Sequence, residues 1–287
     1  MTRRRKTKLK RELIDFTFIL PALVIFIYII IVPLFAGIRY TFTDWNGMAR
    51  EIHFVGLKNY ITVFSDQDLL KPIRNTAVYT VLTTLIINVL GLALAMMVTK
   101  EFRGVNIIKS IVFVPLVVSL VLVSYMWMYI YSDLFGYLGL SSPLTKGSTV
   151  MLGICAMAIW KEAGLAMMIY LAALKNVPQD FYEATTIDGA GFWAKFRNIT
   201  IPMIAPAFTY CIPYWIAGGL RMYDYSYVAT GGGPNHNSES MAYYIYEYLF
   251  PYNKVGYGQT VAMIYLVFCL ILSHYVTKAL RKREIEM

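Results

Sequence analysis

Residues 176–202 have the sequence NVPQDFYEATTIDGAGFWAKFRNITIP. Pro178 suits the first position of a helix, where the N–H that proline lacks would have no partner within the helix. Gly189 can adopt backbone angles that other residues resist. Beyond this glycine, apolar residues repeat at helical spacing: Phe192, Phe196 and Ile199. The stretch therefore predicts two short helices hinged at a glycine, with Pro202 ending the second.

The sequence on both sides of this stretch is apolar. Of the 287 residues, 58% are hydrophobic and 15% are charged, which is more apolar than one soluble core requires. A helix that crosses the hydrocarbon layer of a membrane needs about 20 mostly apolar residues. Six stretches qualify: Phe16 to Ile38, Thr76 to Val98, Ile107 to Tyr131, Val150 to Leu174, Met203 to Leu220 and Gly258 to Leu280. We therefore expect an all-α membrane protein with six transmembrane helices.

Lysine and arginine gather at alternate ends of these spans, and cytoplasmic flanks are the ones that retain basic residues. With the amino terminus inside, the inner flanks contain Arg3, Arg4, Arg5, Lys6, Lys8, Lys10, Arg11, Lys100, Arg103, Lys109, Lys175, Lys195, Arg197, Lys278, Arg281, Lys282 and Arg283. The first apolar run is longer than the roughly 7–15 residues of a cleavable secretion signal. Both termini are therefore expected in the cytoplasm, and residues 39–75 and 222–257 form long outer loops.

Several classes of function find no support in the sequence. The net charge of +9 is explained by the flanks of the spans, and no nucleic-acid-binding motif accompanies it. Cys155, Cys211 and Cys269 lie in apolar runs without CxxC spacing, so neither a disulfide framework nor a metal site is indicated. The pattern GxxxxGK followed by Ser or Thr does not occur. We therefore expect a chain that is not an enzyme and that binds no nucleic acid, metal or cofactor itself.

The hinged stretch resembles the EAA loop of ABC importer permeases, whose pattern is EAA, a short gap, G and then IxLP. The matching residues are Glu183, Ala184, Thr185, Gly189, Ile199, Ile201 and Pro202. Thr185 stands where alanine is usual and Ile201 where leucine is usual. The IDGAG of residues 187–191 and the GGGP of residues 231–234 are similar to segments of carbohydrate-type permeases, which include maltose, oligosaccharide and glycerol-phosphate systems.

The resemblance implies one subunit of a type I importer in a bacterial cytoplasmic membrane, surrounded by membrane lipid. Its partners would be a second homologous permease, two ATP-binding subunits that hold ATP and Mg, and an extracytoplasmic solute-binding protein. Residues 1–70 would form the basic terminus, first span and outer loop, residues 71–280 the transporter domain and residues 281–287 a cytoplasmic tail. The implied cargo is a sugar or oligosaccharide; glycerol phosphate or another small solute is the alternative.

The resemblance also implies that residues 176–202 act as a coupling helix seated in a cleft of an ATPase subunit. Apolar rings would seat this segment and an acid would add a charged contact. The residues expected there are Phe181, Glu183, Ala184, Thr185, Asp188, Gly189, Ala190, Phe192 and Phe196. Periodicity alone is equally compatible with a helix that lies on the membrane surface.

Charged residues near the middle of the fourth predicted span mark a candidate cargo pathway. A charge at that depth is unfavourable by roughly 2.5–3.5 kcal/mol unless it faces water or a partner. Lys161 and Glu162 are neighbours that point about 100° apart on a helix, so they do not fully satisfy one another. The expected pathway contains Asn88, Trp160, Lys161, Glu162, Gly164, Tyr210, Tyr214 and Trp215. Ion pairs with a neighbouring helix and plain packing are the alternative roles.

Five residues after the fifth predicted span are expected to meet the solute-binding protein: Asp224, Gly231, Gly232, Gly233 and Pro234. A tight turn that leads into the sixth span is the alternative. Two rival functions come from other classes. A secondary transporter would couple to ions through carboxylates within the membrane, where only Glu162 is deeply placed. A membrane scaffold would bind a partner through its cytoplasmic helix and would carry no flux.

Overall fold

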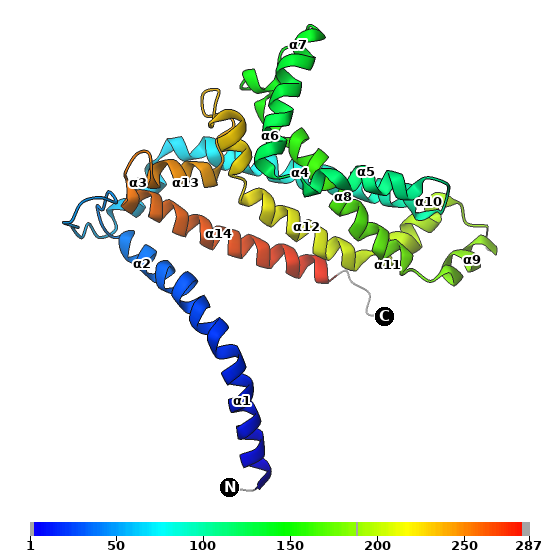
Figure 1. The fold of residues 1–287 in the computed structure, drawn as a ribbon, viewed down its shortest axis with the longest axis horizontal. Helices are drawn as coiled ribbons and strands as arrows, with labels where there is room; N and C mark the ends of the chain where they lie inside the picture. The colour runs from blue at the N-terminus through cyan, green and yellow to red at the C-terminus, as the bar shows by residue number, and fades with distance from the viewer. Residues whose placement is uncertain (1–2, 188, 283–287) are drawn as a thin grey trace. The chain divides into compact units, whose positions relative to one another are not determined.

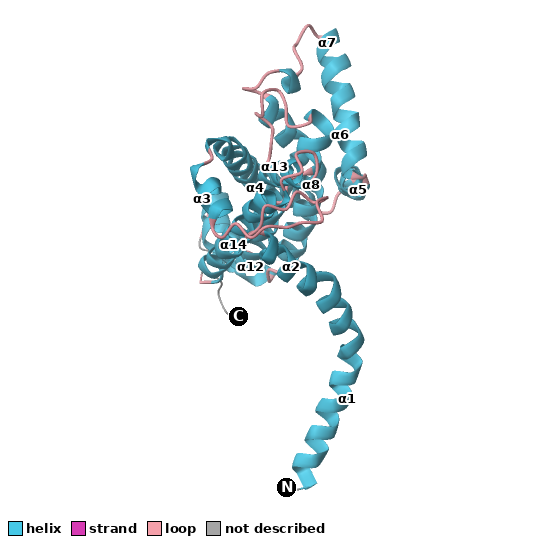
Figure 2. Ribbon diagram, turned by 90° about the vertical axis from the view of Figure 1, so that its left-hand side faces the viewer, coloured by secondary structure: helices cyan, strands magenta, loops and turns pink. Residues whose placement is uncertain are grey.

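The computed structural model describes residues 3–187 and 189–282, and most of them are helical (Figure 2). In chain order the elements are α1 (Arg3–Phe26), η1 (Ile27–Ile31), α2 (Val32–Tyr40), α3 (Lys58–Ser65), η2 (Gln67–Leu69), α4 (Leu70–Thr99), α5 (Val105–Val117), α6 (Leu120–Tyr129), η3 (Ile130–Leu134), α7 (Phe135–Tyr137), η4 (Pro143–Thr145), α8 (Val150–Lys175), α9 (Gln179–Ile187), α10 (Phe192–Lys195), η5 (Phe196–Thr200), α11 (Ile201–Met203), α12 (Ala205–Leu220), η6 (Tyr225–Thr230), α13 (Met241–Leu249) and α14 (Val255–Arg281). Of these, η2 and η4 are 3₁₀-helices and the other η elements are π-helices. Extended pairing among the described residues is confined to one isolated bridge between Thr43 and Phe54. The expected all-α class is confirmed.

The chain divides into two compact units. The first contains residues up to 65 together with residues 247–263, and the second contains residues 66–246 together with the chain from 264 onward. Helices α13 and α14 each begin in one unit and end in the other.

In the first unit, α1, η1 and α2 form one uninterrupted helical run. The most apolar part of this run has no residue buried against the rest of the protein. The loop after α2 is fixed by polar contacts. Asn59 on α3 donates from its side-chain amide to the carbonyls of Thr41 at 2.8 Å and Thr43 at 2.9 Å. The backbone N–H of His53 donates to the carboxylate of Asp44 at 2.9 Å, and this hydrogen bond lowers the pKa of Asp44 below its usual value.

In the second unit, α4 packs against both α8 and α12 (Figure 1). Glycine permits these close approaches. A Cβ added at Gly91 of α4 would lie 2.3 Å from the Cβ of Ala166 on α8, and one added at Gly219 of α12 would lie 2.6 Å from Thr80 Oγ1 on α4. Small residues let helix backbones approach in membrane proteins. The buried core between these helices includes Ile87, Ala95, Met167, Tyr170, Ile204 and Cys211.

Within the described residues, four single helical stretches are long and apolar enough to cross a membrane: Asp15–Tyr40, Gln67–Thr99, Val150–Lys175 and Val255–Arg281. They coincide with the first, second, fourth and sixth predicted spans. Up to two more spans come from bent helix pairs, which correspond to the third and fifth predicted spans.

The third predicted span, Ile107 to Tyr131, is not one continuous helix in the structure, as the sequence had predicted, but two helical runs. Helix α5 and the helical run Leu120–Tyr137 meet at an angle of 103°. Pro115 lies near the end of α5, where it removes a backbone donor, and Ser119 begins α6 by accepting the N–H of Leu122 at 3.3 Å. Hydropathy records the apolar content of such a stretch and not its direction.

The fifth predicted span, Met203 to Leu220, follows a second bend. The helical run Phe192–Met203 and α12 meet at 69°, with Ile204 between them at φ −94° and ψ 10°. Pro202 does not end the preceding helix as predicted, because it lies in the first turn of α11, where a proline is tolerated. The break therefore comes two residues later than expected, and α12 continues directly from the hinged segment.

Candidate functional site

Gly189 ends α9 in a left-handed conformation with φ +75°. Its N–H donates to the carbonyl of Thr186 at 3.1 Å, and the N–H of Ala190 donates to the carbonyl of Thr185 at 3.0 Å. These two bonds form the Schellman motif, which satisfies carbonyls at the end of a helix and favours glycine at the left-handed position. The glycine of the motif therefore closes the first short helix and turns the chain toward the second.

Two side-chain contacts join the helices on either side of this turn. The hydroxyl of Tyr182 on α9 lies 3.0 Å from Thr200 Oγ1, and Nζ of Lys195 on α10 donates to Thr186 Oγ1 at 2.6 Å. Together with the two Schellman bonds, these contacts hold α9 against the helical run formed by α10, η5 and α11, so the four elements form one connected segment. We call residues 179–203 the foot.

The foot carries exposed apolar side chains. Its exposed residues include Phe181, Glu183, Ala184, Ile187, Phe192 and Trp193. Phe196 is half-buried and stacks on Phe192 with ring centroids 6.1 Å apart. Asp188 lies outside the described residues. A surface with this many exposed rings is typical of a binding interface.

A cavity of about 330 Å³ lies in the second unit where α4, α8, α12 and the chain after α12 meet. Its lining combines apolar side chains, aromatic rings and charges: Tyr79, Thr83, Ile87, Leu120, Ala158, Glu162, Tyr214, Trp215, Gly218, Gly219, Arg221, Met222, Tyr223, Asp224 and Tyr225. We call it the central cavity. Glu162, Tyr214 and Trp215 of the predicted pathway line it, and Asp224, which was predicted to dock a protein, lines it as well.

Lys161 does not line the central cavity. The residue is buried, with 7% of its surface exposed. Its Nζ donates to the carbonyl of Leu116 at 2.8 Å and lies 3.9 Å from the carboxylate of Glu162. Leu116 is in the last turn of α5, where carbonyls have no partner within the helix. The ammonium therefore supports the bend between α5 and α6.

Trp160 and Gly164 also lie outside the cavity lining. Trp160 packs edge-on against Trp127 of α6, with ring centroids 5.8 Å apart and planes at 75°. Gly164 faces the backbone of α5, since a Cβ there would lie 2.3 Å from the carbonyl oxygen of Val112. Both residues pack α8 against its neighbours.

Asn88 and Tyr210 occupy different surroundings from the cavity. Asn88 donates to the carbonyl of Thr84 at 2.6 Å and accepts from the hydroxyl of Tyr170. It lines a separate, largely apolar hollow of about 610 Å³ with Thr80, Val81, Leu85, Val89, Phe208 and Leu272 among its neighbours. Tyr210 is exposed and stacks on Tyr214 at 5.9 Å.

Among the cavity residues that were missed from the sequence, five have polar side chains: Tyr79, Thr83, Arg221, Tyr223 and Tyr225. Tyr79 and Thr83 are one helical turn apart on one face of a mostly apolar span, and that spacing is the signal that could have found them. The three residues after α12 had no such signal, because the chain there leaves the regular helix. Burial raises the pKa of the Tyr223 hydroxyl to about 12.

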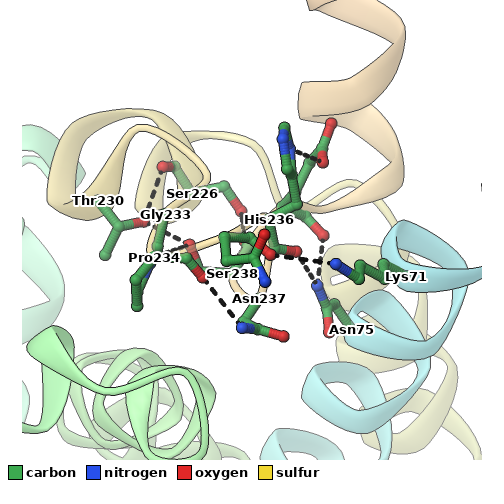
Figure 3. A network of polar contacts seen from close by, with 11 residues as sticks. Lys71, Asn75, Ser226, Thr230, Gly233, Pro234, His236, Asn237 and Ser238 are labelled. Carbon is green, nitrogen blue, oxygen red and sulfur yellow. Dashed lines mark hydrogen bonds and ion pairs between the residues drawn. The ribbon is translucent and has the colours of Figure 1, made fainter. Parts of the chain in front are cut away.

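The glycine-rich loop after η6 is internally bonded (Figure 3). Ser238 lies at its centre. Ser238 Oγ donates to the carbonyl of Gly233 at 2.6 Å and lies 2.7 Å from Thr230 Oγ1, while its carbonyl accepts from Ser226 Oγ at 2.7 Å. Gly231 and Gly232 have φ of +56° and +78°, which suits glycine at both positions.

Helix α4 holds this loop from the other side (Figure 3). The side-chain amide of Asn75 donates to the carbonyls of His236 at 2.9 Å and Glu239 at 3.0 Å, and Lys71 Nζ donates to the carbonyl of Asn235 at 3.4 Å. The loop with Gly231, Gly232, Gly233 and Pro234 is therefore an ordered element of the second unit. Asp224 is not part of this bonded group.

Residues 87–284 match the model of a family described as the binding-protein-dependent transport system inner membrane component. The chain belongs to this family. This permease is 33% identical over 279 residues to a probable starch degradation products transport system permease protein of Thermoanaerobacterium thermosulfurigenes, with 94% of each chain covered. It is 30% identical over 283 residues to the trehalose/maltose transport system permease protein of Thermococcus litoralis, with 93% of each covered.

The fold of the permease is similar to that of a chain in a bacterial ABC transporter involved in the import of the acidic polysaccharide alginate. The TM-score is 0.83 at 20% identity, and the match covers 97% of this chain and 99% of that one. The identification made from the EAA loop is confirmed. The permease is thus a multi-pass component of the inner membrane in a transport system that depends on a binding protein.

Proposed function

We propose that this permease carries a sugar or oligosaccharide through the central cavity, driven by ATP that two separate ABC subunits hydrolyse. The main support for this proposal is the set of side chains that line the cavity. Trp215, Tyr214 and Tyr79 offer flat apolar rings, while Glu162 and Thr83 offer hydrogen-bonding oxygens. A sugar presents apolar C–H faces and polar hydroxyl edges, so this mixture of groups suits it.

The relatives point to the same class of cargo, because their names refer to starch degradation products and to trehalose and maltose. Glycerol phosphate is the alternative cargo. A phosphate group is bound by clusters of cationic donors. The central cavity has one arginine, Arg221, and two carboxylates, Glu162 and Asp224, which favours an uncharged cargo over an anionic one.

The foot would couple the ATPases to this cavity. The apolar contacts with an ATPase subunit would come from Phe181, Phe192 and Phe196. Glu183 would add a charged contact. The small side chains around the turn belong to Ala184, Thr185 and Ala190. The foot continues through Ile204 into α12, and α12 carries Tyr214 and Trp215. A rigid-body movement of the foot would therefore move cavity-lining side chains and open the cavity to one side or the other.

A second permease subunit would close the open side of the cavity, and the solute-binding protein would deliver cargo at the end of α12 opposite the foot. The bonded loop that contains Gly231, Gly232, Gly233 and Pro234 is the proposed docking element. Asn75 and Ser238 hold this loop in shape before any partner arrives, which lowers the entropy lost on docking.

The test uses the whole transporter, purified with its partner permease, its ATPase subunits and its binding protein and placed in lipid nanodiscs. ATP hydrolysis is measured with a panel of di- and oligosaccharides and with glycerol phosphate. We expect a sugar to stimulate hydrolysis in wild type, and Trp215→Ala to abolish the stimulation while basal hydrolysis persists. Stimulation by glycerol phosphate alone would overturn the sugar assignment, and unchanged stimulation in Trp215→Ala would overturn the role of the cavity.

A further inference from the structure

Four tyrosines lie together just beyond the carboxyl end of α12. Tyr223 and Tyr227 come from the chain around η6, and Tyr243 and Tyr246 come from α13. Tyr223 and Tyr227 are one helical turn apart and their rings stack at 5.4 Å with planes at 14°. Tyr243 and Tyr246 stack at 6.2 Å and 20°. We call this group the tyrosine cluster.

Every ring of the cluster contacts the other three. Tyr246 meets the first pair edge-on, at 5.3 Å from Tyr223 and 5.7 Å from Tyr227, and Tyr243 lies 6.1 Å and 6.0 Å from the same two rings. Stacked and edge-on pairs at these separations are the favourable arrangements of aromatic rings. The cluster is therefore a rigid patch with fixed ring planes, and it does not depend on a bound molecule for its shape.

The cluster is buried at one end and open at the other. Tyr243 is buried, Tyr223 and Tyr246 are half-buried, and Tyr227 is 48% exposed. Tyr223 also lines the central cavity. The cluster thus forms a continuous aromatic strip from the cavity wall to an open surface. Because the foot precedes α12 and the cluster follows it, the strip lies at the end of α12 opposite the foot.

We propose that the tyrosine cluster is a second carbohydrate-binding subsite, at the mouth of the central cavity, that holds further sugar units of an oligosaccharide whose first units occupy the cavity. This proposal rests on the proposed sugar-import function. The apolar C–H face of a pyranose ring packs on an exposed aromatic ring, and the phenol hydroxyls exchange hydrogen bonds with the sugar hydroxyls. A disaccharide fits within the cavity alone, whereas a longer chain reaches Tyr227. The cluster therefore sets a preference for chain length.

The experiment measures equilibrium binding of radiolabelled maltose and maltopentaose to the whole complex in nanodiscs, trapped with nucleotide and without binding protein. Tyr227→Ala removes the exposed ring, and Tyr227→Phe keeps the ring without its hydroxyl. We expect Tyr227→Ala to raise the Kd for maltopentaose about fivefold, the value of one aromatic contact, and to leave the Kd for maltose unchanged. Tyr227→Phe should bind maltose as wild type does and should bind maltopentaose more tightly than Tyr227→Ala, because it loses only the hydrogen bond of the hydroxyl. Unchanged maltose binding also shows that the variant is folded.

Three results would overturn the proposal. Equal loss of affinity for both sugars would mean that Tyr227 only supports the cavity. Unchanged affinity for both, with weaker capture of the purified binding protein, would make the cluster a protein interface. If Tyr227→Ala cannot be purified, Tyr246→Ala takes its place under the same criteria. Wild-type complex that binds no member of a panel of α-glucans, β-glucans and arabinans would refute the sugar-import function, and the subsite with it.

Discussion

Lys161 places a basic side chain inside a membrane-spanning helix. Contacts within the protein satisfy this side chain, so it needs no bound cargo as a partner. Its ammonium donates to the carbonyl of Leu116 at the end of α5, and the carboxylate of Glu162 lies 3.9 Å away. Glu162, the next residue, turns to the central cavity instead. Two adjacent charges in one helix therefore have different surroundings, one at a helix bend and one in the proposed cargo path.

Replacing Lys161 by Met should destabilise the protein, because the Leu116 carbonyl loses its donor. We expect a loss of about 1–3 kcal/mol in the free energy of unfolding, seen as earlier thermal unfolding of the purified complex. Glu162→Gln is the matched control, and it should keep wild-type stability while changing sugar-stimulated ATP hydrolysis. A Lys161→Met protein as stable as wild type would show that the contact with Leu116 has no structural value.

Gly189 offers a test of the foot that involves backbone strain alone. Its φ is +75°, and a Cβ at this position would meet no atom within 4 Å. Gly189→Val should therefore disfavour the turn by about 1–3 kcal/mol without any collision. The matched control is Gly191→Ala, since Gly191 also has open space around it but has φ −74°.

Import activity and co-purification of the ATPase subunits provide the readout for this pair. Gly189→Val should insert in the membrane and import poorly, while Gly191→Ala should import as wild type does. If the two variants import equally well, the turn at Gly189 has no part in coupling.

Bent helices are the main feature at the scale of elements. The turn at Gly189 and the apolar content of all six spans could be predicted from the sequence, because glycine conformation and hydropathy are local properties. The 103° bend between α5 and α6 could not, although Pro115 and Ser119 lie at it. Prolines are common inside transmembrane helices, so their presence does not reveal a bend. For the same reason Lys161 could be recognised as unusual, but its partner on another helix could not be identified.

The close packing of α8 against α5 is tested at Gly164. A Cβ at this position would lie 2.3 Å from a backbone oxygen of α5, which cannot move aside as a flexible side chain would. Gly164→Ala should therefore separate the two helices at a penalty of about 1–3 kcal/mol, measured as thermal unfolding of the complex. Gly136→Ala, where the new methyl group meets no atom within 4 Å, is the control and should unfold as wild type does. Equal stability of both variants would contradict the packing described.

In the whole permease, the foot and the glycine-rich loop must face opposite sides of the membrane if the foot meets the ATPases and the loop meets the binding protein. Single cysteines at Asn176 and Asn235, both exposed, test this in a protein whose Cys155, Cys211 and Cys269 have been replaced. In intact cells, a membrane-impermeant maleimide should label the cysteine at position 235 and leave the cysteine at position 176 unlabelled. The cysteine at position 176 should be labelled only after the membrane is permeabilised. Labelling of both positions in intact cells would contradict the topology.

We propose that ATP acting on the foot side drives sugar across the membrane through this permease. The most direct measurement is uptake of radiolabelled maltose and maltopentaose into proteoliposomes that contain the complete transporter, with ATP enclosed and binding protein outside. We expect uptake of at least one of these sugars, and we expect this uptake to need both enclosed ATP and external binding protein. Glu183→Ala in the foot should greatly reduce it. Uptake that persists without ATP and follows an imposed proton or sodium gradient would contradict it and would identify a secondary transporter instead.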